Sequence, residues 1–150
     1  MTILPNPKIL TFRIEVPHLA PTEGIQKCIG FSRWHHHWSS VRLGIKNNTG
    51  KIELWNYSYI KGKRYQDKIG TFEVGEMLFV KLKWKNRSIS VHIDDGFYIH
   101  SSAIPCNIKL LPCLGYLLNP YFEQDGVDAK GEDMEINIWD VVVDGMRVGW

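Results

Sequence analysis

Apolar and polar residues alternate with a period of two through the middle of the chain, residues 71–101. Two runs carry apolar residues at every second position: Leu78, Val80, Leu82 and Trp84, then Ile89, Val91 and Ile93. This is the period of a β-strand with one buried face. Asn86-Arg87 supplies a turn between the runs, and Asp95-Gly96 is typical of a hairpin turn because glycine accepts a positive φ. The pattern predicts a three-strand antiparallel meander.

The same alternation, bounded by turn residues, recurs along the rest of the chain. Further strands are expected at residues 10–16, 28–34, 41–45, 51–60 and 134–138, with 141–148 extending the last one. Residues 108–118 predict a buried strand with a bend at Pro112 and Gly115, 61–68 a charged link, and 119–133 the longest loop. We find no convincing helical stretch. Many short strands separated by turns predict an all-β, antiparallel two-sheet sandwich or jelly roll.

Composition narrows the class of protein and of partner. With 150 residues and 44% hydrophobic residues, we expect a single domain, residues 1–150, with a real core. The net charge of +2 is too weak to favour nucleic acid, and no apolar run is long enough for a membrane span. The first residues lack the layout of a signal peptide, so the chain is either cytoplasmic or had a signal removed. Cys28, Cys106 and Cys113 lack zinc-site spacing, and we expect free, buried thiols.

Several segments resemble the concanavalin A-like lectin/glucanase superfamily. They are Gly-Thr-Phe-Glu-Val-Gly-Glu at 70–76 leading into 79–82, the strand and Asp-Gly turn at 89–96, the segment at 110–116, and the closing strand at 134–138. The resemblance covers roughly residues 40–140. It implies a jelly roll of two curved sheets, and it leaves the function to be argued from the residues.

The strand at 51–60 carries three aromatic residues on one face. Trp55, Tyr57 and Tyr59 share that face with Glu53, and apolar residues such as Leu54 take the other. On an open sheet the rings form a platform on which the C–H faces of sugars stack, and polar neighbours bond the hydroxyls. The alternative is that the rings fill the core.

Arg42, on the preceding strand, shares a face with Gly44. If the two strands pair across the turn at 47–50, Arg42 and Trp55 lie on the same sheet face, and the glycine leaves room for a ligand. The alternative is an arginine that is simply solvated.

Residues 33–38 read Arg-Trp-His-His-His-Trp. On a strand, His35 and His37 share one face and His36 takes the other. Two imidazoles at this spacing can bind a metal, but the sequence shows no third ligand nearby, so we predict no metal site and no cofactor. We expect His35 or His37 to contact a sugar ligand instead.

Two kinds of enzyme with this architecture are alternatives. Retaining glucanases carry E-x-D-x-x-E on one strand, whereas the nearest segment here, residues 135–140, has Asn137 in the central position. Residues 59–66 are similar to the Y-x-K-x-G-x-Y-x-Q run of alginate lyases but one residue shorter, and the other lyase elements are absent. A lyase would use Tyr59 or Tyr65 as base and Arg42 to neutralise a uronate.

The sequence therefore predicts a carbohydrate-binding module or lectin-like protein that recognises an oligo- or polysaccharide without transforming it. The predicted ligand-binding residues are His35, His37, Arg42, Glu53, Trp55, Tyr57 and Tyr59. A polysaccharide lyase, a glycoside hydrolase and a protein-interaction module are the alternatives. The identity of the sugar, the oligomeric state and the compartment stay open.

Overall fold

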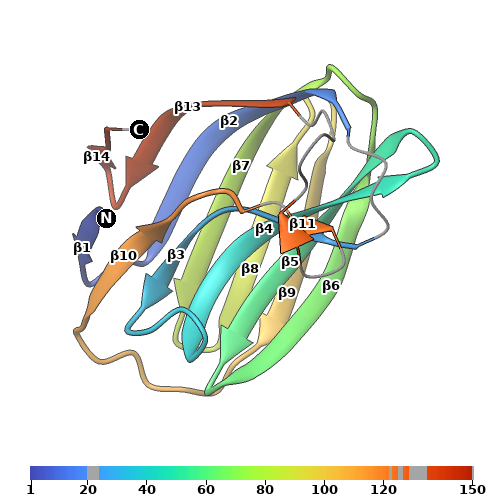
Figure 1. Cartoon of the computed structure of the whole chain (residues 1–150). Helices are drawn as coiled ribbons and strands as arrows, with labels where there is room; N and C mark the ends of the chain where they lie inside the picture. Colours follow the sequence, from blue (N-terminus) through green and yellow to red (C-terminus); the bar gives the residue numbers. More distant parts are fainter. Residues whose placement is uncertain (20–23, 122, 125–126, 129–134, 150) are drawn as a thin grey trace.

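Two six-stranded antiparallel sheets face each other in the computed structural model (Figure 1). The structure describes residues 1–19, 24–121, 123–124, 127–128 and 135–149, and no helix occurs among them. Sheet A has the order β1 (Ile3–Pro5), β10 (Leu114–Leu118), β3 (Gln26–Arg33), β4 (Ser39–Asn48), β5 (Lys51–Ile60) and β6 (Lys63–Phe72). Sheet B has the order β14 (Met146–Arg147), β13 (Glu135–Val143), β2 (Ile9–His18), β7 (Met77–Lys85), β8 (Ser88–Asp94) and β9 (Ile99–Pro105). β11 (Glu123–Gln124) and β12 (Val127–Asp128) pair separately.

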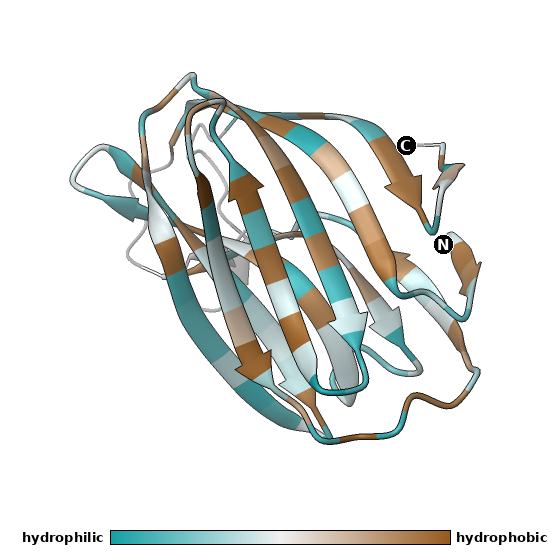
Figure 2. Ribbon diagram, turned by 180° about the vertical axis from the view of Figure 1, so that it is seen from behind, coloured by the Kyte–Doolittle hydropathy of each residue, from teal (hydrophilic) through white to brown (hydrophobic). Residues whose placement is uncertain are grey.

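The predicted jelly-roll sandwich is confirmed, and the core lies between the two sheets. The sheet B strands β2 and β7 alternate buried apolar residues with more exposed ones, which gives the alternating brown and teal bands of Figure 2, whereas β3, β4 and β5 of sheet A are buried over most of their length. The fully buried side chains include Phe12 and Leu82 of sheet B, and Ile45 and Leu54 of sheet A. Burial of these alternate positions on both sheets is the main stabilising contribution to the fold.

The central meander is also confirmed. β7 pairs with β8, and β8 pairs with β9, both antiparallel, so the runs at Leu78–Trp84 and Ile89–Ile93 contribute one continuous apolar face. Gly96 has a φ of 94°, as its place in the second turn requires.

One predicted link is in fact a strand. Residues 61–68 were expected to be a charged connection, but β6 (Lys63–Phe72) pairs with β5 along its length. β6 is the outer strand of sheet A and most of its first residues are exposed, so it lacks the apolar alternation that identifies a strand in a sequence. The prediction of a link at residues 61–68 was therefore wrong.

Two other boundaries differ from the prediction. β2 continues through Pro17, because its pairing with β7 has already ended at Glu15 and the missing N–H is not needed there. Of residues 108–118, only Leu114–Leu118 form a strand, and in the segment before it the carbonyl of Leu111 accepts a hydrogen bond from the Arg33 side chain. The expected loop at 119–133 lies mostly outside the described residues.

All three cysteines are free and buried, as predicted. Burial raises the pKa of the Cys28 thiol to about 12, so this thiol is unreactive at neutral pH. In the described residues, no helix meets the length and hydropathy needed for a membrane span.

Candidate functional site

The outer face of β5 carries the aromatic residues that the sequence singled out. Ile52, Leu54 and Ile60 belong to the core, and the alternate positions point away from it. Tyr57 is buried, and Trp55 and Tyr59 are partly exposed, all three on the outer side of sheet A. β4 pairs with β5 so that Arg42 lies opposite Tyr57. The rings therefore do not lie between the sheets.

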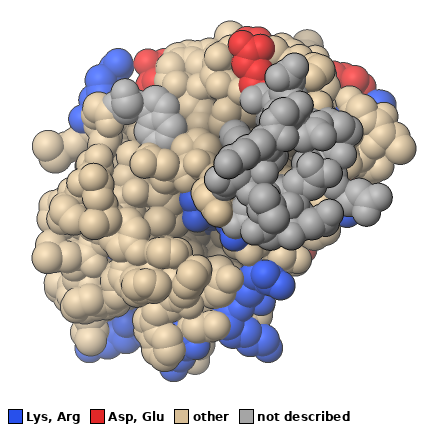
Figure 3. Space-filling model, in the orientation of Figure 1, with Lys and Arg blue, Asp and Glu red and all other residues tan. Residues whose placement is uncertain are grey.

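A groove of about 560 Å³ lies over this face, and we call it the sheet A groove. Its lining comes from the N-terminus, β3, the turn before β4, β4, β5, β10 and the segment after β10. The lining residues are Met1, Lys27, His36, His37, Ser40, Arg42, Tyr57, Tyr59, Tyr116, Leu117, Leu118, Asn119 and Tyr121. Lys and Arg atoms are visible in the hollow near the middle of this face, beside the grey residues (Figure 3). Two permanent cations and no carboxylate occur among these described lining residues.

Arg42 is held in the groove by main-chain oxygens. Its Nε donates to the carbonyl oxygen of Cys28 at 2.7 Å, and its Nη2 donates to that of Asn119. The pairing of β3 with β4 shifts register between Lys27 and Gly30, next to the carbonyl that receives Arg42. A Cβ on Gly30 would lie 2.8 Å from the Arg42 Cα and 3.0 Å from its Cγ. Gly30 therefore provides the space that the Arg42 side chain crosses.

The predicted space above Gly44 is not open. A Cβ on Gly44 would lie 2.6 Å from the Cγ2 atom of Ile25. The expectation that Gly44 leaves room for a ligand is therefore wrong, since a side chain from the segment before β3 occupies that space.

Cations surround the Tyr57 ring. The Lys27 Nζ and the Arg64 Cζ each lie 6.0 Å from its centroid. The Tyr59 ring lies 6.1 Å from Tyr57 and 5.7 Å from His37. Burial, followed by the neighbouring Tyr57, raises the pKa of Tyr59, which makes its hydroxyl a poor base at neutral pH.

The histidine run is a turn and not a strand. Backbone N–H groups of Trp38 and Ser39 both donate to the carbonyl of His35 at 2.9 Å, and Trp34 has a φ of 72°. The expected separation of His36 from its neighbours is therefore wrong. His36 and His37 line the groove, whereas His35 does not.

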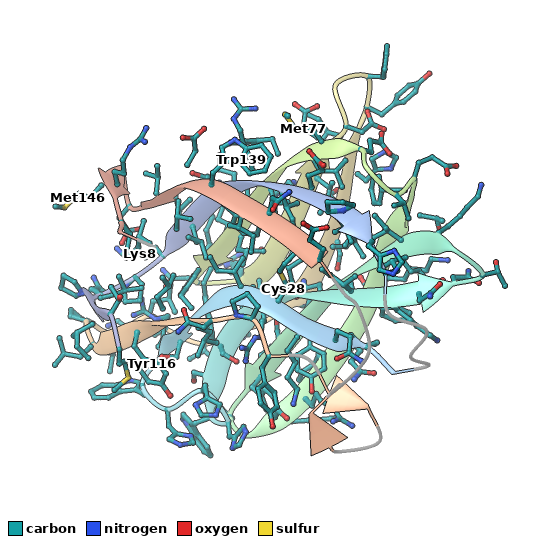
Figure 4. The ribbon with its side chains drawn as sticks, turned by 45° about the horizontal axis from the view of Figure 1, so that its top comes forward. Lys8, Cys28, Met77, Tyr116, Trp139 and Met146 are labelled. Carbon is teal, nitrogen blue, oxygen red and sulfur yellow. The ribbon has the colours of Figure 1, made fainter. Side chains whose placement is uncertain are left out.

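Tyr116 connects this turn to β10, which lies beside β3 (Figure 4). Its hydroxyl lies 2.5 Å from the His36 Nδ1 and accepts the His36 backbone N–H at 3.1 Å. Burial, then the neighbouring imidazoles of His37 and His35, lower the pKa of His36, so its ring is neutral at pH 7.

Glu53 and Trp55 lie on the same sheet face but outside the groove lining. The Glu53 carboxylate accepts the indole N–H of Trp55 at 3.0 Å and the amide N–H of Asn48 at 2.8 Å, and it pairs with Lys68 at 3.4 Å. Desolvation opposes ionisation, but these contacts, led by Lys68, hold the pKa of Glu53 below its usual value. Glu53 therefore serves to hold Trp55 and the turn between β4 and β5.

Of the seven predicted residues, four line the groove: His37, Arg42, Tyr57 and Tyr59. His35, Glu53 and Trp55 do not. The sequence reasoning missed Lys27, His36 and Tyr116, which come from three separate segments. For Lys27, the sequence signal was its place next to Cys28: a strand that buries Cys28 points Lys27 to the outer face. Tyr65, a base considered for a lyase, packs against the core.

No protein-family model and no curated protein sequence matches the chain. Solved structures do match. The alginate lyase from Klebsiella pneumoniae has a TM-score of 0.70 at 10% identity, over 91% of this chain and 59% of the lyase. Scytalido-glutamic peptidase has a TM-score of 0.60 at 15% identity, over 97% and 80% of the two chains. The alginate lyase from Alteromonas sp. 272 has a TM-score of 0.57 at 8% identity, over 91% and 70%. The chain therefore has the concanavalin A-like jelly-roll fold, and at these identities the likeness shows the fold alone.

Proposed function

We propose that the sheet A groove binds an oligo- or polysaccharide that carries carboxylate or other acidic groups, without transforming it. The observation that carries the proposal is the combination of Tyr57 and Tyr59 with Lys27 and Arg42 in one groove whose described lining has no carboxylate. Tyrosine offers an apolar ring face and a hydroxyl, which suits the alternating C–H and O–H surface of a sugar. Fixed cations without competing carboxylates favour an acidic sugar over a neutral one.

The position of Arg42 supports this role. Its side chain is held by two backbone carbonyls, so the ordering of a long flexible side chain is already achieved before a ligand binds. Burial lowers the pKa of Arg42, although the group stays protonated at any physiological pH. A partly desolvated cation gains from an incoming anion because the charge is poorly hydrated beforehand.

The test is a binding measurement on matched glycans. Polyuronates and their neutral counterparts of equal length are titrated by calorimetry into the full chain and into Lys27→Gln, with Lys81→Gln on the outer face of sheet B as control. We expect binding of the acidic glycan that weakens with salt and on Lys27→Gln, and that Lys81→Gln leaves unchanged. Equal affinity for neutral and acidic glycans would overturn the charge argument, and no glycan binding would favour a protein-interaction surface.

A polysaccharide lyase is the second candidate, and the pairing of His36 with the Tyr116 hydroxyl favours it. β-Elimination needs a group that removes the proton beside a uronate carboxyl, a donor for the leaving oxygen and a cation that neutralises the carboxylate. An imidazole, a phenol and Arg42 line the same groove. Ultraviolet absorbance of an unsaturated product after incubation with polyuronates distinguishes the two candidates, since simple binding produces none.

A further inference from the structure

Three consecutive imidazoles gather at the end of the sheet A groove. The ring centroids of His35 and His36 are 4.5 Å apart, those of His36 and His37 4.2 Å, and those of His35 and His37 5.4 Å. One ring nitrogen from each residue lies within 4.8 Å of the other two. A strand could not achieve this, because it would direct His36 to the opposite face.

The backbone of the turn holds the three residues in this arrangement. His35 accepts two backbone N–H groups through its carbonyl, and the Ser40 hydroxyl donates to the carbonyl of His36 at 2.9 Å. His36 is additionally held from β10, because Tyr116 contacts both its backbone N–H and its ring. The side chains therefore converge from a backbone that is already ordered.

We propose that His35, His36 and His37 together bind one transition-metal ion of the type that imidazole prefers, with Zn²⁺ as the reference ion. Zinc–nitrogen bonds of about 2.0–2.1 Å in tetrahedral geometry place ligand nitrogens about 3.3 Å apart. Nitrogens within 4.8 Å reach that spacing when each ring moves by about 1 Å, a rotation that two exposed side chains make without repacking.

Tyr116 would not bind the metal itself but would hold one of its ligands, the ring of His36. Histidines that bind metals commonly bond their second ring nitrogen to a fixed oxygen, which sets the tautomer and the ring orientation. The Tyr116 hydroxyl stands 2.5 Å from the His36 Nδ1, and that contact leaves Nε2 to the metal. His35 Nδ1 accepts the His37 backbone N–H at 3.2 Å, a long bond that coordination through this nitrogen would replace.

Three protein ligands leave at least one coordination position open. His36 and His37 line the groove, so that position is accessible from it. Metal binding by the turn does not depend on the proposed glycan binding, and each can fail without the other.

The test uses the full chain without a polyhistidine tag. Calorimetric titration with Zn²⁺ should give one ion per chain, and Co²⁺ should give the visible absorption of a nitrogen-ligated site. His35→Gln and His37→Gln should each weaken Zn²⁺ binding by about tenfold or more. The control His92→Gln, on sheet B, should leave affinity unchanged. Tyr116→Phe should weaken binding by about 10–100-fold and shift the Co²⁺ spectrum, while the thermal unfolding midpoint stays close to wild type.

A second measurement needs no variant. Nuclear magnetic resonance should show the imidazole signals of His35, His36 and His37 changing together and saturating at one equivalent of Zn²⁺, with those of His92 unchanged. A dissociation constant weaker than about 1 mM, or equal weakening by His92→Gln and His37→Gln, would overturn the proposal. So would saturation with only two of the three rings perturbed.

Discussion

Replacing Arg42 by glutamine tests how the groove is held together. The change removes two hydrogen bonds from a charged donor, one to the carbonyl of Cys28 and one to that of Asn119. Bonds of this kind contribute about 1.5–3 kcal/mol each, and the total here is smaller than the sum because the exposed Asn119 carbonyl regains water. We expect the unfolding free energy to fall by about 2–3 kcal/mol, most of it from the carbonyl of the buried Cys28, which loses its partner.

Urea denaturation measures this change through the midpoint at constant slope. For a chain of this size the same loss lowers the thermal midpoint by about 4–12 °C. Arg64→Gln is the matched control, since Arg64 is an exposed cation on β6 of the same sheet, and its effect should stay within about 0.5 kcal/mol. Arg42→Lys should lower the unfolding free energy by most of the amount expected for Arg42→Gln, because lysine cannot donate to both carbonyls at once. It should keep the salt dependence of glycan binding, because lysine retains the positive charge. An Arg42→Gln protein as stable as Arg64→Gln would refute the reasoning.

Three further changes test neighbouring features. Gly30→Ala places a Cβ 2.2 Å from the carbonyl oxygen of Val41, so the unfolding free energy should fall by about 3 kcal/mol, and a wild-type urea midpoint would contradict this close approach. Tyr59→Ala, at a partly exposed ring, should change stability by less than about 1 kcal/mol yet weaken acidic-glycan binding about tenfold in calorimetry. Unchanged affinity would mean that this ring does not contact the ligand. The pKa of Glu53 is lowered from 4.5, so its stabilising contribution is present above that pH and is lost as the pH falls through the lower folded pKa. The difference in urea midpoint between wild type and Glu53→Gln should therefore shrink in acid, and a constant difference from pH 7 to the acid range would show that the ion pair with Lys68 contributes nothing.

The sandwich could be predicted because burial of one strand face leaves a direct trace in the sequence. β7 and β8 lie inside sheet B and pack a full face on the core, so their apolar residues recur at every second position. β6 has the same backbone geometry but covers little of the core, and its residues between 63 and 68 carry no alternation. Strand pairing at an edge depends on main-chain hydrogen bonds, which every residue type except proline can make. A strand of that kind is not visible in a hydrophobic pattern.

The candidate site could be predicted only where it follows the strand period. Tyr57 and Tyr59 were placed on one face because the two-residue period of β5 puts them opposite Ile52 and Leu54, and Arg42 was placed with them through its pairing register. The strand period gave the wrong arrangement for the histidine run, because Trp34 has a left-handed backbone and a turn begins there instead of a strand. In that turn His36 joins its neighbours, and one ring nitrogen from each of the three residues lies within 4.8 Å of the others.

The contacts that complete the site join segments far apart in the chain. Arg42 and Asn119 are separated by 77 positions, and His36 and Tyr116 by 80. Both pairs exist because β10 lies against β3 in sheet A, a neighbour relation that no local period encodes. The close approach of these two strands does leave a mark in composition, since a Cβ on Gly115 would lie 1.9 Å from the carbonyl oxygen of Ser32. Gly30 and Gly115 thus mark the places where β3 meets its two partners, and the groove residues that periodicity missed, Lys27 and Tyr116, lie on β3 and β10 themselves.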